Sequence, residues 1–345
     1  MHSTAASRSR WLPFSSTMFR EVKYFSRRLF RTLTLLLFTV CLCNQSFSQT
    51  KIFTSDIDNF WKVYDRIKET NDTSQQLQII QSIYFDKASK GLKSFITEAR
   101  ITISCLLRNI KRKPRFWSSI RLKTLAIKSH NQELENIILR YRKLYSKFKS
   151  PNIYFVIGCL STGGTTKRDE ILIGAEIASA DSTVDASEIG EWLKGVFKDG
   201  KGVEYLVAHE MTHTQQPDGD SEDDGKSNLL GYCIVEGAAD FIAELLLQKP
   251  INSPYMTYGK ANEKILWKEF QKEMYGQNAS SWLYNGGDTS HADLGYFEGY
   301  AICKSYYQNA KDKKKAIADI INLDRKNLNA LSNFLAKSKY ADKWE

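Results

Sequence analysis

The segment Asn228–Leu247 places the strongest constraint on how this chain can fold. It reads NLLGYCIVEGAADFIAELLL, so almost every residue is apolar or small. A helix that is apolar on all sides has to be buried, yet Glu236, Asp240 and Glu244 recur every four residues and share one face. Buried carboxylates need a cation or several hydrogen-bond donors. The segment therefore predicts an interior helix whose carboxylates meet such partners.

A second segment, Val203–Gln215 (VEYLVAHEMTHTQ), supplies suitable partners. It contains His209, Glu210 and His213 in the pattern HExxH. Residues four apart lie on one helical face, so the two imidazoles can reach one metal ion. Glu210 lies beside them, where its carboxylate can take a proton from a water on that metal. The alternative is an ordinary helical face.

Together the two segments predict a zinc site. Two histidines and one glutamate, with the fourth position open to water, are a known catalytic zinc set. His209, His213 and Glu236 would be the ligands of one Zn²⁺ per chain. Asp240 lies one turn after Glu236, where it could accept the free ring N–H of a zinc-bound histidine and fix its orientation.

The spacing of these motifs resembles a known group of enzymes. HEMTH followed by EGAAD looks like the HExxH…ExxxD signature of the gluzincin metallopeptidases. The region of about residues 150–310, including Gly295–Tyr300 (GYFEGY), also resembles uncharacterised bacterial predicted zinc-dependent peptidases related to gliding-motility lipoproteins. The resemblance implies a zincin-like core and peptide hydrolysis.

Carried over residue by residue, the resemblance repeats the same assignment. His209, His213 and Glu236 match the zinc ligands, Glu210 matches the general base, and Asp240 matches the aspartate that orients the first histidine. The alternatives are a structural salt-bridge network, or a descendant that kept its ligands without activity.

A peptidase also needs an electrophile for the developing oxyanion. His291, Tyr296 and Tyr300 lie beyond the zinc-binding helices, where gluzincins commonly place such a residue, and Tyr296 is favoured. The alternatives are a solvated loop for His291 and core packing for the tyrosines. By the same resemblance, Ile171–Ile177 would be the edge strand that binds substrate; the alternative is an interior strand.

The organisation of the chain predicts an α+β fold that is mostly α-helical. Residues 51–150 show helical spacing of apolar residues, and helical spacing returns from about residue 187. Between them, Asn152–Leu160 and Ile171–Ile177 read as a hairpin or as two neighbouring strands, and Ser161–Thr166 (STGGTT) reads as a turn. We expect an N-terminal helical region, 49–150, and a zincin-like metallopeptidase domain, 151–345, with a small sheet, the HExxH helix, the glutamate helix and C-terminal helices.

The first 48 residues read as an export signal. A basic stretch precedes the apolar run Leu33–Cys43, and small polar residues follow it. The run is shorter than a membrane span requires. Residues 1–48 are therefore expected to be a cleaved signal peptide, with Met18 a possible true start, and the mature chain to be periplasmic or extracellular. An uncleaved anchor is the alternative.

The charge pattern argues against a nucleic-acid partner. The formal charge is +10, but residues 1–48 carry +6 of it. Residues 100–150 carry 14 Lys and Arg against Glu133 and Glu135, whereas residues 168–245 carry 18 Asp and Glu against five Lys and Arg. The basic region is either a solvated face that complements the acidic half, or a contact for a membrane surface or an acidic partner.

Other functions find less support in the sequence. Four cysteines follow residue 48 without a CxxC pair, which argues against a cysteine zinc site. Asp218–Gly225 (DGDSEDDG) lacks the glycine spacing of an EF-hand and reads as a solvated acidic loop. The sequence thus favours an exported zinc peptidase acting on a peptide or protein. The alternative is a non-catalytic cell-envelope protein, associated with motility or secretion, that retains a zinc site.

Overall fold

The computed structural model describes residues 50–217, 227–286 and 291–344. The expected signal peptide, the possible start at Met18 and the acidic loop Asp218–Gly225 lie outside these residues. Gln49–Glu345 form one compact unit. Among the residues described, no helix combines the length and the apolar character needed to cross a membrane.

The described chain is mostly helical, as expected. The part before the HExxH motif contains α2 Ser55–Arg66, α3 Thr73–Ile80, α4 Lys90–Glu98, α5 Ile103–Arg112, α6 Pro114–Leu125, α7 Asn131–Leu144, α8 Ala175–Ala178 and α9 Glu191–Asp199. The C-terminal half contains α10 Val203–His213, α11 Leu229–Leu247, α12 Pro254–Glu273, α13 Leu294–Asn309, α14 Lys313–Ile321 and α15 Leu328–Ser338. Short 3₁₀ or π turns occupy Ile67–Glu69, Gln81–Phe85, Ala126–His130 and Ala341–Lys343.

The described strands form one mixed sheet in the order β1-β2-β4-β3. They are β1 Ile52–Phe53, β2 Asn152–Val156, β3 Gly164–Lys167 and β4 Glu170–Gly174. β2 is parallel to both β1 and β4, with Asn152 opposite Glu170, and β3 is antiparallel to β4, with Gly164 opposite Ile173. The expected strands β2 and β4 are therefore neighbours, but the hairpin joins β3 to β4.

The expectation that Ile171–Ile177 forms the edge strand is wrong. β4 lies between β2 and β3, and all five of its residues are buried. The apolar run ILI within this strand is typical of a strand covered on both faces. The edge strands are instead β1 and β3. β3 begins within the segment that reads as a turn, and its four residues are all half-buried. Ile177 itself belongs to the short helix α8.

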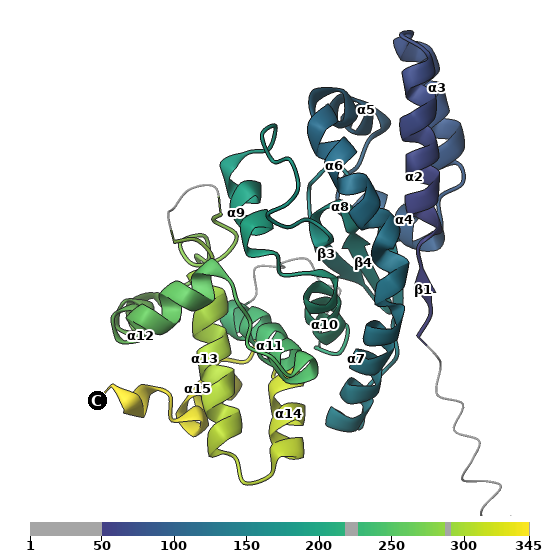
Figure 1. Ribbon diagram of the computed structural model, residues 1–345. Helices are drawn as coiled ribbons and strands as arrows, with labels where there is room; N and C mark the ends of the chain where they lie inside the picture. Colours follow the sequence, from purple (N-terminus) through teal and green to yellow (C-terminus); the bar gives the residue numbers. More distant parts are fainter. Residues whose placement is uncertain (1–49, 218–226, 287–290, 345) are drawn as a thin grey trace, which may run out of the picture. The chain divides into compact units, whose positions relative to one another are not determined.

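The helices that carry the HExxH motif and Glu236 lie between the sheet and the C-terminal helices (Figure 1). α10 contacts β3 and β4 on one side and α11 on the other, and α11 in turn packs along α13. The order in space is thus sheet, α10, α11, α13. Both helices are consequently shielded from solvent over most of their length.

The crossing of α11 and α13 depends on two glycines. A Cβ atom at Gly237 would come within 2.0 Å of the backbone nitrogen of Tyr300, and one at Gly299 within 1.7 Å of the carbonyl oxygen of Cys233. The two backbones therefore touch. This close contact fixes the position of Glu236, which directly precedes Gly237.

The basic region, residues 100–150, partly pairs with the acidic half of the same chain. Lys123 Nζ lies 2.8 Å from Asp181 Oδ2, and His130 Nδ1 lies 2.6 Å from Glu204 Oε1. The backbone N–H of Arg115 donates to Glu188 Oε2 at 2.9 Å. Of these contacts, the Lys123–Asp181 pair joins two of the counted charges, and a membrane or partner contact stays a prediction.

Candidate metal centre

The helix α10 brings the side chains of His209 and Glu210 into the interior. Gly200 and Gly202 have φ angles of +51° and +84°, and these left-handed conformations let the chain turn sharply from α9 into α10. Val207, Ala208 and Met211 then anchor the helix because they are almost completely buried. His209 and Glu210 are buried as well, with 6% and 8% of their surface exposed.

The helix α11 begins at a well-formed cap. The side chain of Asn228 accepts a hydrogen bond from the backbone N–H of Gly231 at 2.9 Å, satisfying one of the unpaired donors of the first turn. The helix then runs buried to Leu247 and presents Glu236 and Asp240 toward α10. The third carboxylate of the stripe, Glu244, lies apart from this group and pairs with Lys304 at 2.8 Å.

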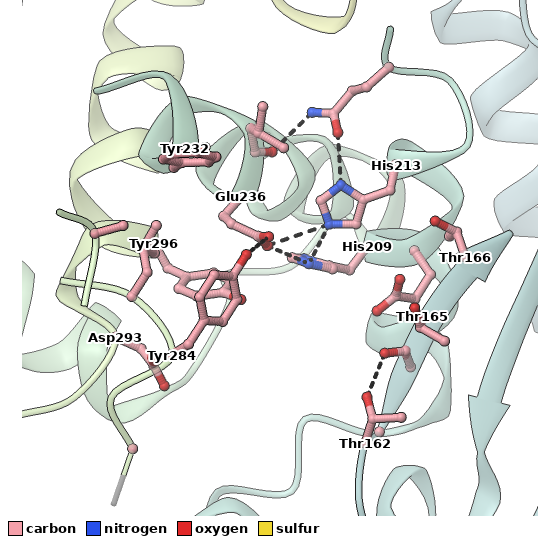
Figure 2. A pocket seen from close by; sticks show the side chains of 18 of the residues that line it. Thr162, Thr165, Thr166, His209, His213, Tyr232, Glu236, Tyr284, Asp293 and Tyr296 are labelled. Atoms are coloured by element: carbon pink, nitrogen blue, oxygen red, sulfur yellow. Dashed lines mark hydrogen bonds and ion pairs between the residues drawn. The ribbon is translucent and has the colours of Figure 1, made fainter. Parts of the chain in front are cut away.

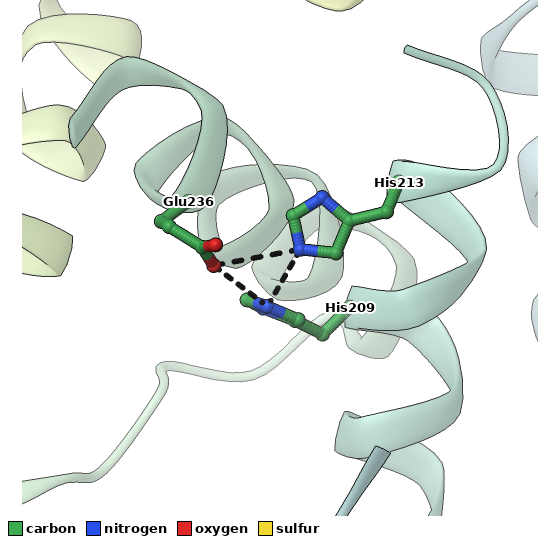
Figure 3. A group of neighbouring side chains, drawn as sticks. All are labelled: His209, His213 and Glu236. Atoms are coloured by element: carbon green, nitrogen blue, oxygen red, sulfur yellow. Dashed lines mark hydrogen bonds and ion pairs between the residues drawn. The ribbon is translucent and has the colours of Figure 1, made fainter. Parts of the chain in front are cut away.

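His209, His213 and Glu236 converge on one point (Figure 3). His209 Nε2 lies 3.1 Å from His213 Nε2, and Glu236 Oε2 lies 3.3 Å from the His209 nitrogen and 3.4 Å from the His213 nitrogen. A tetrahedral zinc ion with bonds of about 2.0–2.1 Å would hold its ligand atoms about 3.3 Å apart. The donor types and their separations therefore fit zinc, and the three residues form a group that could hold a metal ion.

Each histidine is oriented through its other ring nitrogen. His209 Nδ1 lies 2.9 Å from Asp240 Oδ1, and His213 Nδ1 lies 2.7 Å from Gln216 Oε1. Gln216 is itself held by its side-chain N–H, which donates to the carbonyl oxygen of Val235 at 2.9 Å. Both Nε2 atoms are left facing Glu236, as metal ligation requires.

Two tyrosines surround the Asp240 carboxylate. The hydroxyl of Tyr255 donates to Asp240 Oδ2 at 2.8 Å, and that of Tyr205 donates to Oδ1. Lys201 Nζ in turn donates to the Tyr255 hydroxyl at 2.8 Å. These hydrogen bonds satisfy a carboxylate that is completely buried.

The sequence analysis missed four residues of this group. Tyr205 and Gln216 could have been found, because they lie four residues before His209 and three after His213, at helical spacing. Tyr255 and Lys201 come from other segments and carry no such signal.

The electrostatics of the group favour a divalent cation. Burial alone would lower the pKa of His209, but hydrogen bonds to Asp240 and Glu236 raise it to about 10. Burial alone would raise the pKa of Glu236, but the two histidines hold it well below its usual range. The two imidazoles thus sit in a field created by buried carboxylates. A divalent cation would take the place of the protons that this field attracts.

Glu210 lies against the edge strand. A Cβ atom at Gly164 of β3 would come within 2.6 Å of Glu210 Oε1, so the missing side chain makes room for the carboxylate. Burial raises the pKa of Glu210 and outweighs the opposing effect of the two histidines.

The three residues expected to stabilise the oxyanion lie in different surroundings. Tyr296 lines a cavity that opens onto the metal ligands, and its ring stacks beside that of His209 with the centroids 6.2 Å apart. His291 does not line the cavity and stacks on Tyr258, at 3.7 Å between centroids. The hydroxyl of Tyr300 donates to Glu244 at 2.7 Å, away from the metal ligands.

Tyr284 was not expected near the site. Its hydroxyl donates to Glu236 Oε1 at 2.6 Å, and 70% of the residue is exposed (Figure 2). Its φ angle of +58° is uncommon for a bulky residue, and strained conformations of this kind cluster at functional sites. No spacing in the sequence indicates this contact, because Tyr284 lies in an irregular segment.

A cavity of about 1020 Å³ opens onto the metal ligands. Figure 2 shows Glu236, Tyr284 and Tyr296 on one side of it and Thr162, Thr165 and Thr166 on the other. The wall opposite Glu236 and the two tyrosines is therefore the edge strand β3 and the segment before it. The site lies at the bottom of a cleft that is large enough for a peptide.

Comparison with known proteins supports part of this interpretation. A family model described as "Predicted Zn-dependent protease (DUF2268)" matches residues 193–329. The match includes α10 and α11 and all three metal-binding candidates, but not the sheet or the N-terminal helices, and it covers less than half of the chain. No curated protein and no solved structure matches this chain.

Proposed function

We propose that this protein is an exported zinc metallopeptidase that cleaves peptides or proteins. The observation that carries the proposal is the preformed group of His209, His213 and Glu236, with ligand atoms 3.1–3.4 Å apart, at the bottom of an open cleft. The matching family description supports the same chemistry. Export rests on residues 1–48 of the sequence alone.

Zinc, when bound by these three residues, would polarise the scissile carbonyl and lower the pKa of the attacking water. Glu210 is the proposed general base because it follows His209 directly and lies against the cleft wall at Gly164. Its carboxylate would take the proton of the water and deliver it to the leaving nitrogen. Asp240 holds the His209 ring in the orientation that ligation needs.

Tyr296 is the proposed donor to the oxyanion. Burial raises its pKa well above the usual range, so the phenol keeps its proton and can donate a hydrogen bond. Tyr284, whose hydroxyl already reaches Glu236, is a second candidate. His291 stacks on Tyr258 and does not line the cavity, so it is a weaker candidate. The backbone of the edge strand β3 is proposed to pair with an extended substrate.

Metal analysis of purified residues 49–345 tests the proposal. We expect about one zinc ion per protomer, lost in His213→Ala because a ligand is removed. Glu210→Gln should keep the zinc but abolish cleavage of a peptide mixture, since only the base is changed. Tyr296→Phe should lower kcat with little change in zinc content.

The outcomes are distinct. A folded protein purified without chelator that holds no zinc would reject the metal site and favour the non-catalytic envelope protein. Full activity of Glu210→Gln would remove Glu210 from its role. Full activity of Tyr296→Phe, together with a loss of activity in Tyr284→Phe, would assign the hydrogen bond to the oxyanion to Tyr284 instead.

A further inference from the structure

The cleft has a second compartment that the proposed chemistry does not use. It has a volume of about 550 Å³ and meets the larger compartment at His209, Glu210 and Tyr296, which line both. The two compartments extend in opposite directions along α10. The smaller one follows the helix toward its start, past Leu206 and Tyr205, and the larger one follows it past His213 to Gln216.

The walls of the smaller compartment are mainly apolar. They come mainly from α8 and the residues after it, from α9 and α10, and from the start of α12. Their aliphatic members include Ile177, Ala180, Val196, Leu206 and Pro254. Trp192, Tyr255 and Tyr296 add aromatic rings. Two charged wall residues have partners: Lys201 donates to Tyr255, and Glu191 pairs with Lys194 at 2.6 Å. Among the described residues, Asp293 Oδ1 is buried without a hydrogen-bond partner, at the end of the pocket that meets the larger compartment.

The larger compartment has a different chemical character. Polar side chains are more numerous in its own wall, among them Thr165, Gln216, Gln277 and Asn278, while Pro217, Val235 and Leu283 add apolar surface. A chain bound across the metal ligands would therefore meet an apolar pocket on one side and a more polar cleft on the other. Asp293 lines both compartments and lies where they join.

We propose that the smaller compartment receives a bulky aliphatic or aromatic side chain of the substrate, next to the bond that is cleaved. This inference rests on the proposed peptidase activity and adds a preference to it. A pocket of 300–1,000 Å³ with apolar walls is typical of a side-chain or ligand site. Differences of one methylene in such pockets change kcat/KM by about 10-fold or more. We therefore name the lining residues of α9 and α10 as determinants of specificity.

Gly195 offers a way to fill the pocket without disturbing the fold. It lines the compartment from α9, and a Cβ atom there would meet no other atom within 4 Å. Leucine is also a better helix former than glycine. Gly195→Leu should thus narrow the pocket, and it should lower kcat/KM for substrates with large apolar side chains about 10-fold or more relative to substrates with alanine.

Gly190 is the matched control. It directly precedes α9, its Cβ would also meet nothing within 4 Å, and it lines neither compartment. Gly190→Leu should leave the preference unchanged. Leu206→Ala makes the opposite change to Gly195→Leu, because it enlarges the pocket from α10. It should raise kcat/KM for substrates with the largest aromatic side chains relative to substrates with leucine.

The experiment loads the wild type and the three variants with zinc and compares the sites at which each cleaves a defined mixture of 14-residue peptides. A second readout is binding of the hydroxamates of phenylalanine and alanine, measured by calorimetry, since hydroxamates bind zinc without being cleaved. We expect the wild type to prefer the phenylalanine compound and Gly195→Leu to lose most of that preference.

Each result decides between the two proposals. Cleavage without an apolar preference, or a preference that Gly195→Leu leaves unchanged, overturns this inference and leaves the peptidase intact. Absence of cleavage by any zinc-loaded protein rejects the peptidase, while the hydroxamates still test the pocket. A protein that binds no zinc overturns both.

Discussion

At the scale of single residues, the most informative contacts are those of Asp240. Its carboxylate is completely buried yet accepts hydrogen bonds from two tyrosine hydroxyls while it contacts the His209 ring. The contact with His209 could be predicted, because both residues lie on helices at motif spacing. The tyrosines could not, because Tyr255 comes from α12, and only the folded chain brings it to Asp240.

Asp240→Ala should weaken zinc binding about 10–100-fold, because the His209 ring loses the partner that orients it. Tyr255→Phe removes one hydrogen bond to the same carboxylate and should have a smaller effect of the same sign. Competition with a chelator of known affinity measures both. Equal zinc affinity of Asp240→Ala and the wild type would reject the orienting role.

Glu176 should make the stability depend on pH. It is fully buried at the start of α8, and its Oε1 accepts the backbone N–H groups of Gly158 and Leu160 at 3.0 and 3.2 Å. Burial raises its pKa to about 7 from 4.5. The folded protein then binds a proton that the unfolded chain has lost, so the stabilising effect is complete below pH 4.5 and falls as the pH rises to 7.

The expected loss is on the order of 1–3 kcal/mol, at about 1.4 kcal/mol for each pKa unit. Urea unfolding at pH 5 and pH 7.5 measures it. Glu176→Gln should flatten this part of the profile, since glutamine does not titrate. An identical pH profile in the variant would assign the dependence to other groups.

At the scale of elements, the strands show why part of the site escaped the sequence analysis. β2 and β4 are apolar runs, and their existence could be predicted. The order of the sheet could not, because it depends on pairing between distant segments. β3 (GTTK) is short, contains a glycine and has no alternating pattern, so it reads as a turn. The strand that lines the cleft is thus the one with the weakest signal.

Gly237→Ala should destabilise the fold severely. The added methyl group would overlap the backbone of α13, which no side-chain rearrangement relieves, so we expect a loss of about 3 kcal/mol or more. Thermal unfolding, monitored by circular dichroism, measures the change. Gly195→Ala, with open space around its Cβ, is the control and should be neutral or slightly stabilising. A stable Gly237→Ala would mean that α11 and α13 can move apart.

At the scale of the whole molecule, the N-terminal helices share the core that supports the site. β1 pairs with β2 in the sheet, and the Tyr84 hydroxyl bonds both the N–H and the carbonyl of Ile157. Tyr141 of α7 donates to Thr212 of α10 at 3.2 Å. The mostly helical α+β class could be predicted from periodicity, but these long-range contacts could not.

Residues 151–345 alone should therefore not fold. Without residues 49–150, apolar side chains such as Phe155 and Val156, which are fully buried in the whole chain, would be exposed. We expect the fragment to lack a cooperative thermal transition and to bind zinc weakly. Residues 49–345 serve as the control. A fragment that unfolds cooperatively would show that residues 49–150 are a separable region, as a removable propeptide would be.

The contact between Gly164 and Glu210 has a consequence for mapping the site. A methyl group at position 164 would meet the carboxylate of the proposed base at 2.6 Å. Alanine scanning treats a loss of activity as the signature of a lost side chain. At Gly164 the scan adds atoms instead of removing them, so it would mark as essential a residue that contributes no functional group. The position would be read correctly only as the space that another residue needs.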